Sequence, residues 1–135
     1  MKNRLVVFAI IFVVMIAFLG GCYLMVNKVD MGFAQEAEVC FINGTTSAES
    51  RLSDIELAAI KAIFNRKKLF KDNPSCGFSE EVSIKFNQAQ TFCIARDTCP
   101  IIYWKEKDMY FKLSEEEKAE LYKILESYDF YFPCV

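Results

Sequence analysis

The chain has 135 residues and a formal net charge of −2 at pH 7. It contains no histidine, so it lacks the side chain most often used as a general base and as a metal ligand. The charge is mildly acidic, which excludes the electrostatic footprint expected of a nucleic-acid-binding protein.

The N-terminal 26 residues form a signal or anchor segment. The basic start Met1–Arg4 precedes Leu5–Val26, which contains no charged residue. About 20 apolar residues span a bilayer as a helix. Positive charge beside such a segment stays in the cytoplasm, so the rest of the chain is expected outside it. We therefore predict a cell-membrane protein, anchored by its N-terminus, with an extracytoplasmic domain.

Three fates of this segment fit the sequence. It is an uncleaved anchor, a signal peptide cut near Ala34, or a lipoprotein signal. Leu19–Cys22 reads Leu-Gly-Gly-Cys and resembles the bacterial lipobox, in which the cysteine is diacylated and becomes the new N-terminus. That resemblance makes Cys22 the lipidation candidate. The apolar run continues through Tyr23–Val26, where lipoproteins usually become polar.

Residues 27–50 are polar and rich in turn-forming residues, so we predict a tether. Within it, Val39–Ile42 is a short apolar patch that suits an edge strand. Asn43–Thr45 matches the N-glycosylation pattern, but we interpret it as a turn. Residues 51–135 then form the extracytoplasmic domain.

Two helices are predicted by capping boxes. Ser53 with Glu56 begins the first, which should end near Lys68, and Ser114 with Glu117 begins the second. Each is followed by an apolar stripe at helical spacing. The stripes are Leu57, Ile60, Ile63 and Phe64 in the first helix, and Leu121, Ile124, Leu125 and Tyr128 in the second.

Short strands with brief connections fill the middle of the chain, which is typical of an antiparallel meander. We expect four strands, at 82–86, 91–95, 99–104 and 109–112. The predicted fold class is α+β: a small four-stranded antiparallel meander flanked by two helices, in the order α-β-β-β-β-α, after an N-terminal membrane-targeting helix.

Six cysteines on an oxidising side indicate structural disulfides. With Cys22 set aside, the preferred pairs are Cys93 with Cys99 and Cys76 with Cys134. Cys40 is then left as a free thiol. The spacings contain no close cysteine pair of the kind that binds zinc, so neither a metal nor a cofactor is expected.

Aromatic residues offer a candidate binding surface. Both faces of the hairpin formed by strands 91–95 and 99–104 are largely apolar, and two helices cover one face only. The other face must be covered by the aromatic C-terminal tail or be exposed to a partner. The residue types that favour interfaces there are Tyr103, Trp104, Tyr110 and Tyr131.

No catalytic constellation is present in the sequence. The acidic runs Glu80–Glu81 and Glu115–Glu117 stand where elements begin and suit solvated cap charges. We therefore expect a non-catalytic, membrane-tethered module that binds a protein or another envelope component. The alternatives are an envelope thiol-disulfide protein using Cys93 and Cys99, and an inhibitor or immunity-type module directed against a secreted enzyme.

Overall fold

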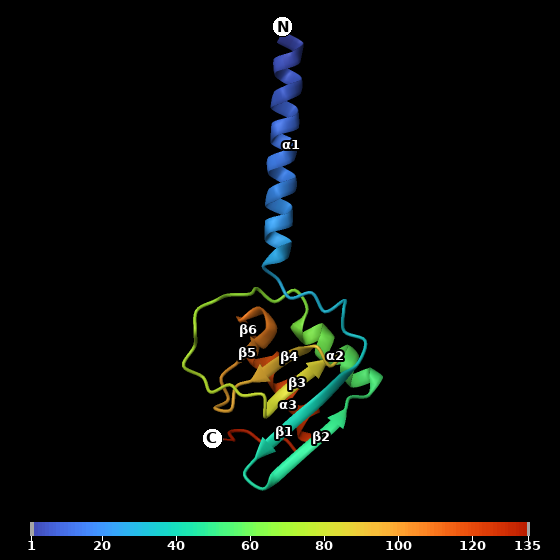
Figure 1. Cartoon of the computed structure of the whole chain (residues 1–135), viewed down its shortest axis with the longest axis vertical. Helices are drawn as coiled ribbons and strands as arrows, with labels where there is room; N and C mark the ends of the chain where they lie inside the picture. The colour runs from blue at the N-terminus through green and yellow to red at the C-terminus, as the bar shows by residue number, and fades with distance from the viewer. Residues whose placement is uncertain (1, 135) are drawn as a thin grey trace.

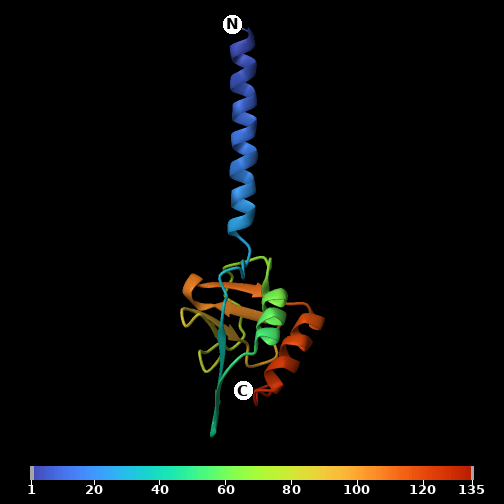
Figure 2. The ribbon, with the colours of Figure 1, turned by 90° about the vertical axis from the view of Figure 1, so that its right-hand side faces the viewer.

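The computed structural model describes residues 2–134, without the side chains of residues 2, 3 and 24–26. The side chain of Lys2, one of the two basic residues of the predicted export signal, therefore lies outside the described part of the chain. Helix α1 (Lys2–Val26) extends away from the rest of the chain (Figures 1 and 2). Its stretch Arg4–Tyr23 has no buried residue and is long and apolar enough to cross a membrane. By length and composition, this helix could anchor the chain in a membrane or serve as a signal sequence.

The domain is α+β, as predicted, but its antiparallel sheet has six strands rather than four. The spatial order is β2-β1-β3-β4-β5-β6. The strands are β1 (Ala37–Asn43), β2 (Thr46–Arg51), β3 (Val82–Phe86), β4 (Gln90–Ile94), β5 (Ile101–Trp104) and β6 (Met109–Lys112). A 3-10 turn, η1 (Lys105–Lys107), joins β5 to β6.

The two additional strands come from the predicted tether, and that prediction is wrong. Residues 27–50 belong to the fold: Val29 and Met31 are buried, and β1 lies between β2 and β3. Strand β2 has no fully buried residue and Ala48 is its one apolar residue, so it lacks the alternation that identifies a strand in sequence. The turn at Gly44 is confirmed, with φ of 58° at that glycine.

Helices α2 (Asp54–Phe64) and α3 (Glu115–Glu126) both begin with the predicted capping boxes. Helix α2 ends before the expected Lys68. Asn65 is already extended, and Arg66 has a φ of 62°. The chain leaves the helix there because residues 66–69 form backbone hydrogen bonds with residues 27–29.

The core lies between the sheet and the two helices, which pack on the same face (Figure 2). Phe64 from α2 is at its centre. Its ring centroid lies 5.2 Å from that of Phe111, 5.6 Å from Phe92 and 6.3 Å from Phe86. Each fully buried ring of this size contributes about 1.5–3 kcal/mol through removal from water.

At β5 and β6, the opposite face of the sheet is covered by the segment between α2 and β3, not by the C-terminal tail. Phe78 packs on Tyr103 and Tyr110, with ring centroids 5.8 and 5.6 Å away. The tail packs on the helix side, where Phe130 lies 4.7 Å from Phe41. The prediction that the aromatic tail covers the face left free by the helices is therefore wrong, because the tail packs on the helix side.

Glu56 connects the beginning of α2 to the end of α3. It accepts hydrogen bonds from the backbone N–H of Ser53, 3.0 Å away, and from the hydroxyl of Tyr128. Hydrogen bonds from Ser53 and then Tyr128 hold the pKa of Glu56 below its ordinary value of 4.5. A lowered folded pKa means that this stabilisation is present above the unfolded pKa and is lost as pH falls through the folded value.

We predict that Glu56→Gln lowers the free energy of unfolding by about 1 kcal/mol at neutral pH, because it weakens the cap and the link to α3. The difference from the unsubstituted chain should disappear in acid, where Glu56 is protonated. Chemical unfolding of the full chain across that pH range measures this. Glu120→Gln, on the exposed side of α3, is the control. A pH-independent loss in the Glu56 variant would contradict the prediction.

Candidate functional site

The disulfide in the structure joins Cys76 to Cys99, with Cα atoms 6.2 Å apart. Both predicted pairs, Cys93 with Cys99 and Cys76 with Cys134, are therefore wrong. Cys93 lies within β4, opposite Ser83 and Tyr103, whereas Cys99 lies in the turn before β5. The disulfide fastens the segment that covers the far face of the sheet to this turn.

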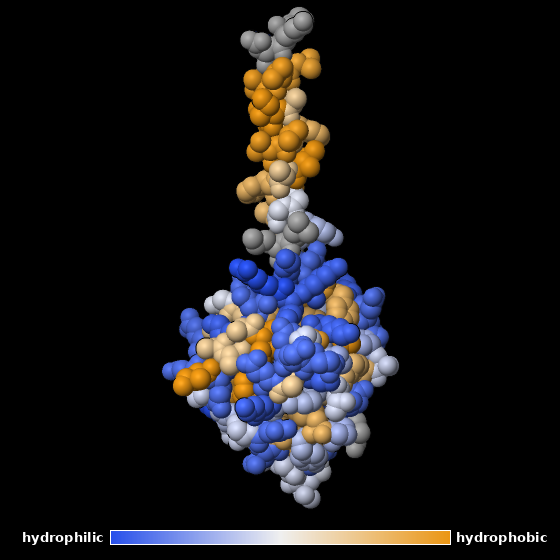
Figure 3. All heavy atoms as spheres, turned by 180° about the vertical axis from the view of Figure 1, so that it is seen from behind, coloured by the Kyte–Doolittle hydropathy of each residue, from blue (hydrophilic) through white to orange (hydrophobic). Residues whose placement is uncertain are grey.

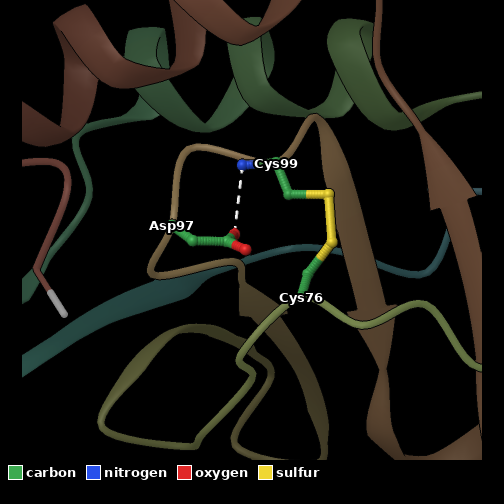
Figure 4. Close-up of side chains that lie close together, drawn as sticks. All are labelled: Cys76, Asp97 and Cys99. Carbon is green, nitrogen blue, oxygen red and sulfur yellow. Dashed lines mark hydrogen bonds between the residues drawn. A yellow bond between two sulfur atoms is a disulfide. The ribbon is translucent and has the colours of Figure 1, made fainter.

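Asp97 lies beside the disulfide (Figure 4) and accepts a hydrogen bond from the backbone N–H of Cys99, 3.2 Å away. The side-chain ligand atoms of Cys76, Asp97 and Cys99 all lie within 4.8 Å of one another. Zinc binds thiolates, and the disulfide consumes both sulfurs, so this arrangement does not form a zinc site. The Asp97 bond organises the turn that carries Cys99.

Within residues 2–134, Cys22, Cys40, Cys93 and Cys134 are free thiols. Burial, with a smaller contribution from Glu80, raises the pKa of the Cys93 thiol to about 11. Burial and the neighbouring Glu49 raise the pKa of Cys40. A reactive cysteine needs the opposite shift, because the thiolate is the nucleophile. The raised pKa values disfavour the thiolate form of Cys40 and Cys93.

The pairing predicts a thiol count. The denatured but unreduced chain should take up an alkylating reagent at four cysteines, the free thiols of the structure, when Cys22 is unmodified. After reduction, all six cysteines should react. Mass spectrometry of the alkylated full chain measures both values. Peptide mapping that finds a Cys93–Cys99 linkage would contradict the pairing.

The four aromatic residues of the predicted binding surface do not form one surface. Trp104 is buried on the helix side, where its ring stacks 4.7 Å from Phe92. Tyr103 and Tyr110 stack on each other at 4.8 Å on the opposite face. Tyr131 is exposed and lies near the β1–β2 hairpin, where its hydroxyl accepts a hydrogen bond from the side chain of Asn43 at 2.7 Å. Of the four residues, Trp104 and Tyr110 are buried, Tyr103 is partly buried and Tyr131 is exposed.

The acidic runs Glu80–Glu81 and Glu115–Glu117 form ion pairs and a helix cap at the ends of strands and helices. Glu80 forms an ion pair with Lys105, which lowers the pKa of Glu80. Glu117 closes the cap of α3 and forms an ion pair with Lys67. Glu115 lies 2.6 Å from Lys118. The pKa values of Glu80, Glu116 and Glu117 are lowered, whereas a general acid needs a raised pKa.

The two edges of the sheet differ. Beyond β6, the backbone N–H of Phe70 donates to the carbonyl of Tyr110 at 2.9 Å, and the N–H of Tyr110 donates back at 2.8 Å. Beyond β2, the described part of the chain places no further strand. One edge is therefore bridged and the other is open.

The phase of the ladder identifies the free backbone groups of the open edge. The N–H of Leu52 donates to the carbonyl of Ala37 at 2.9 Å. Bonded and non-bonded pairs alternate along an antiparallel ladder, so the backbone groups of Ser47, Glu49 and Arg51 point outward. These three residues form the open edge.

A shallow cavity of 240 Å³ adjoins this edge on the face of the sheet opposite the helices. Alternate residues of three neighbouring strands line it with charges of both signs. The lining residues are Glu38, Val39, Cys40, Glu49, Ser50, Arg51 and Lys85. Together, the edge and the cavity offer free backbone groups beside charged side chains, which suits the binding of an extended peptide segment.

Sequence reasoning also missed Arg96. Its guanidinium donates to the carbonyl of Cys134 at 3.1 Å, to the side-chain oxygen of Asn43 at 2.9 Å and to Glu81 at 3.3 Å. It therefore holds the C-terminal tail and the base of the β1–β2 turn together. The only signal in the sequence was an arginine beside a turn, which does not identify its partners.

Comparison with protein-family models, with curated proteins and with solved structures finds no match for this chain. Its function therefore has to be argued from the chemistry of its own surface.

Proposed function

We propose that this chain is a membrane-anchored, extracytoplasmic binding module that holds an extended segment of a partner protein along the open edge of β2. The difference between the two sheet edges carries the proposal. An added strand would satisfy the outward backbone groups of Ser47, Glu49 and Arg51. The cavity beside the edge would supply selectivity for the partner's side chains through Glu49, Arg51 and Lys85.

Two features support the extracytoplasmic side. Lys2 and Arg4 precede the apolar helix, and positive charge there favours a cytoplasmic N-terminus. The Cys76–Cys99 disulfide suits an oxidising compartment, because cytosolic thiols are kept reduced. The domain beyond α1 would then face the periplasm or the cell exterior.

The arrangement also supports presentation of the edge to a partner. The β1–β2 hairpin reaches away from α1, at the end of the domain farthest from that helix (Figure 1). A module anchored by α1 would therefore hold the tip of this hairpin away from the bilayer.

Binding without catalysis is the activity that we propose. The chain has no histidine. The carboxylates of the acidic runs are engaged in caps and ion pairs, and burial keeps Cys93 protonated. These features favour recognition over acid–base, nucleophilic or thiol-exchange chemistry.

The test of strand addition is site-specific photo-cross-linking in intact cells. We predict that a photoreactive phenylalanine at Ser47 forms an adduct with one partner of defined mass. Glu49→Pro should abolish the adduct without unfolding the domain, because it removes an outward N–H that the ladder to β1 does not use. Far-UV circular dichroism checks the fold of each variant.

Two controls make this experiment decisive. The same photoreactive residue at Lys123, on the exposed side of α3, should give no such adduct. Ser50→Pro removes an N–H directed toward β1 and should lower the melting temperature, which checks the phase of the ladder. An adduct that persists in the Glu49→Pro variant would overturn strand addition.

The anchor has its own test. We predict that protein extracted from membranes has the mass of the uncleaved chain, because α1 continues through Cys22 to Val26 without a break. Intact-mass spectrometry measures this. A species that begins at Cys22 and carries acyl chains would instead establish a lipoprotein. A soluble species that begins after Ala34 would establish secretion.

A further inference from the structure

The junction between α1 and the domain contains a pocket that the proposed partner-binding edge does not use. Asn27 and Lys28 follow α1 directly and pair with the segment after α2. The carbonyl of Asn27 accepts a hydrogen bond from the N–H of Leu69 at 2.8 Å. The backbones of Lys28 and Lys68 form an antiparallel β-bridge. The backbone on both sides of the pocket is therefore held by hydrogen bonds.

The pocket has a volume of 690 Å³ and lies where the helix meets the domain. Its lining is amphipathic, with the apolar side chains of Leu69, Phe70 and Met109 beside three lysines. The full lining consists of Tyr23, Asn27, Lys28, Lys68, Leu69, Phe70, Lys71 and Met109.

The three lysines have no protein counter-charge. Among the residues that the structure describes, Lys28, Lys68 and Lys71 take part in no ion pair. By contrast, the neighbouring Lys67 is paired with Glu117. The described lining of the pocket contains no acidic residue. The positive charge of these three lysines would therefore favour binding of an anion that is not part of the chain.

The position of the pocket selects the kind of anion. The apolar stretch of α1 ends at Val26, so Asn27 and Lys28 would lie at the level of the lipid headgroups when α1 crosses a bilayer. Tyr23, on the last turns of the helix, is a residue type that favours this interface. Figure 3 shows the change from the apolar helix to hydrophilic residues at the adjoining end of the domain.

We infer that this pocket binds the headgroup of an anionic phospholipid from the leaflet nearest the domain. The lysines bind the phosphate, and Phe70 and Met109 contact the glycerol and the first methylenes of the acyl chains. The inference rests on the membrane anchoring in the proposed function, but it does not depend on the β2 edge. Its consequence is that the domain is seated on the bilayer by its own lysines.

The test uses the full chain, purified in an uncharged detergent and titrated with phosphatidylglycerol or phosphatidylcholine, with native mass spectrometry as the readout. We expect selective binding of phosphatidylglycerol. A variant carrying Lys28→Gln, Lys68→Gln and Lys71→Gln should bind it at least about tenfold more weakly, because each lysine near an anionic surface contributes to the affinity. The variant with arginine at the same three positions should retain the preference.

The matched control changes the same amount of charge elsewhere. Lys112→Gln, Lys118→Gln and Lys123→Gln, combined in one chain, should leave lipid binding unchanged. Equal binding of the two lipids, or equal losses in both triple variants, would overturn the inference. Displacement of the lipid by millimolar inorganic phosphate would also overturn it, because the site would then recognise free phosphate rather than a membrane lipid.

The outcome is separable from that of the proposed function. The glutamine substitutions in the pocket should leave the cross-link from Ser47 on β2 intact. If that cross-link fails while phosphatidylglycerol still binds, the partner-binding edge is wrong and the lipid site stands.

Discussion

Strands β4 and β5 carry apolar side chains on both faces, and the rest of the domain is arranged to keep both faces from water. Phe92 and Trp104 face the helices, whereas Cys93 and Tyr103 face the other way. Helices α2 and α3 cover the first face. A sheet with one free face would have needed polar residues there. Instead, the segment carrying Phe78 covers the second face and is held in place by the Cys76–Cys99 disulfide.

Because β4 and β5 are buried on both faces, most of their aromatic and thiol groups are not accessible to a partner. Of the four aromatic residues predicted to form a binding surface, three pack within the domain and only Tyr131 is exposed. The buried Cys93 lies beside Tyr103 on the face of the sheet opposite the helices. The accessible groups on which the two proposals rest are the backbone at the edge of the sheet and the lysines at the end of the domain nearest α1.

Local signals in the sequence predicted local structure well. Ser53 and Ser114 identified both helix starts, because a capping box is written within four neighbouring residues. The class of fold and the last strand also followed from short-range pattern. Strand β2 was missed because it has no fully buried residue and Ala48 is its one apolar residue. The disulfide was missed because its partners are set by how the segment before β3 crosses the sheet. The candidate edge depends on the same long-range pairing, so no local pattern predicted it.

The backbone ties at Asn27 and Val29 leave almost no free chain between α1 and the folded domain. A domain on a long linker explores a hemisphere above the membrane, and its orientation averages out. When anchored by α1 as proposed, this domain would turn with its helix, so its height and tilt would be set by the helix in the bilayer. Encounter with a membrane-bound partner of the proposed kind would then be a two-dimensional search between surfaces that are already at a set height. The rate of that search would depend on the density of the two proteins in the membrane rather than on the reach of a tether.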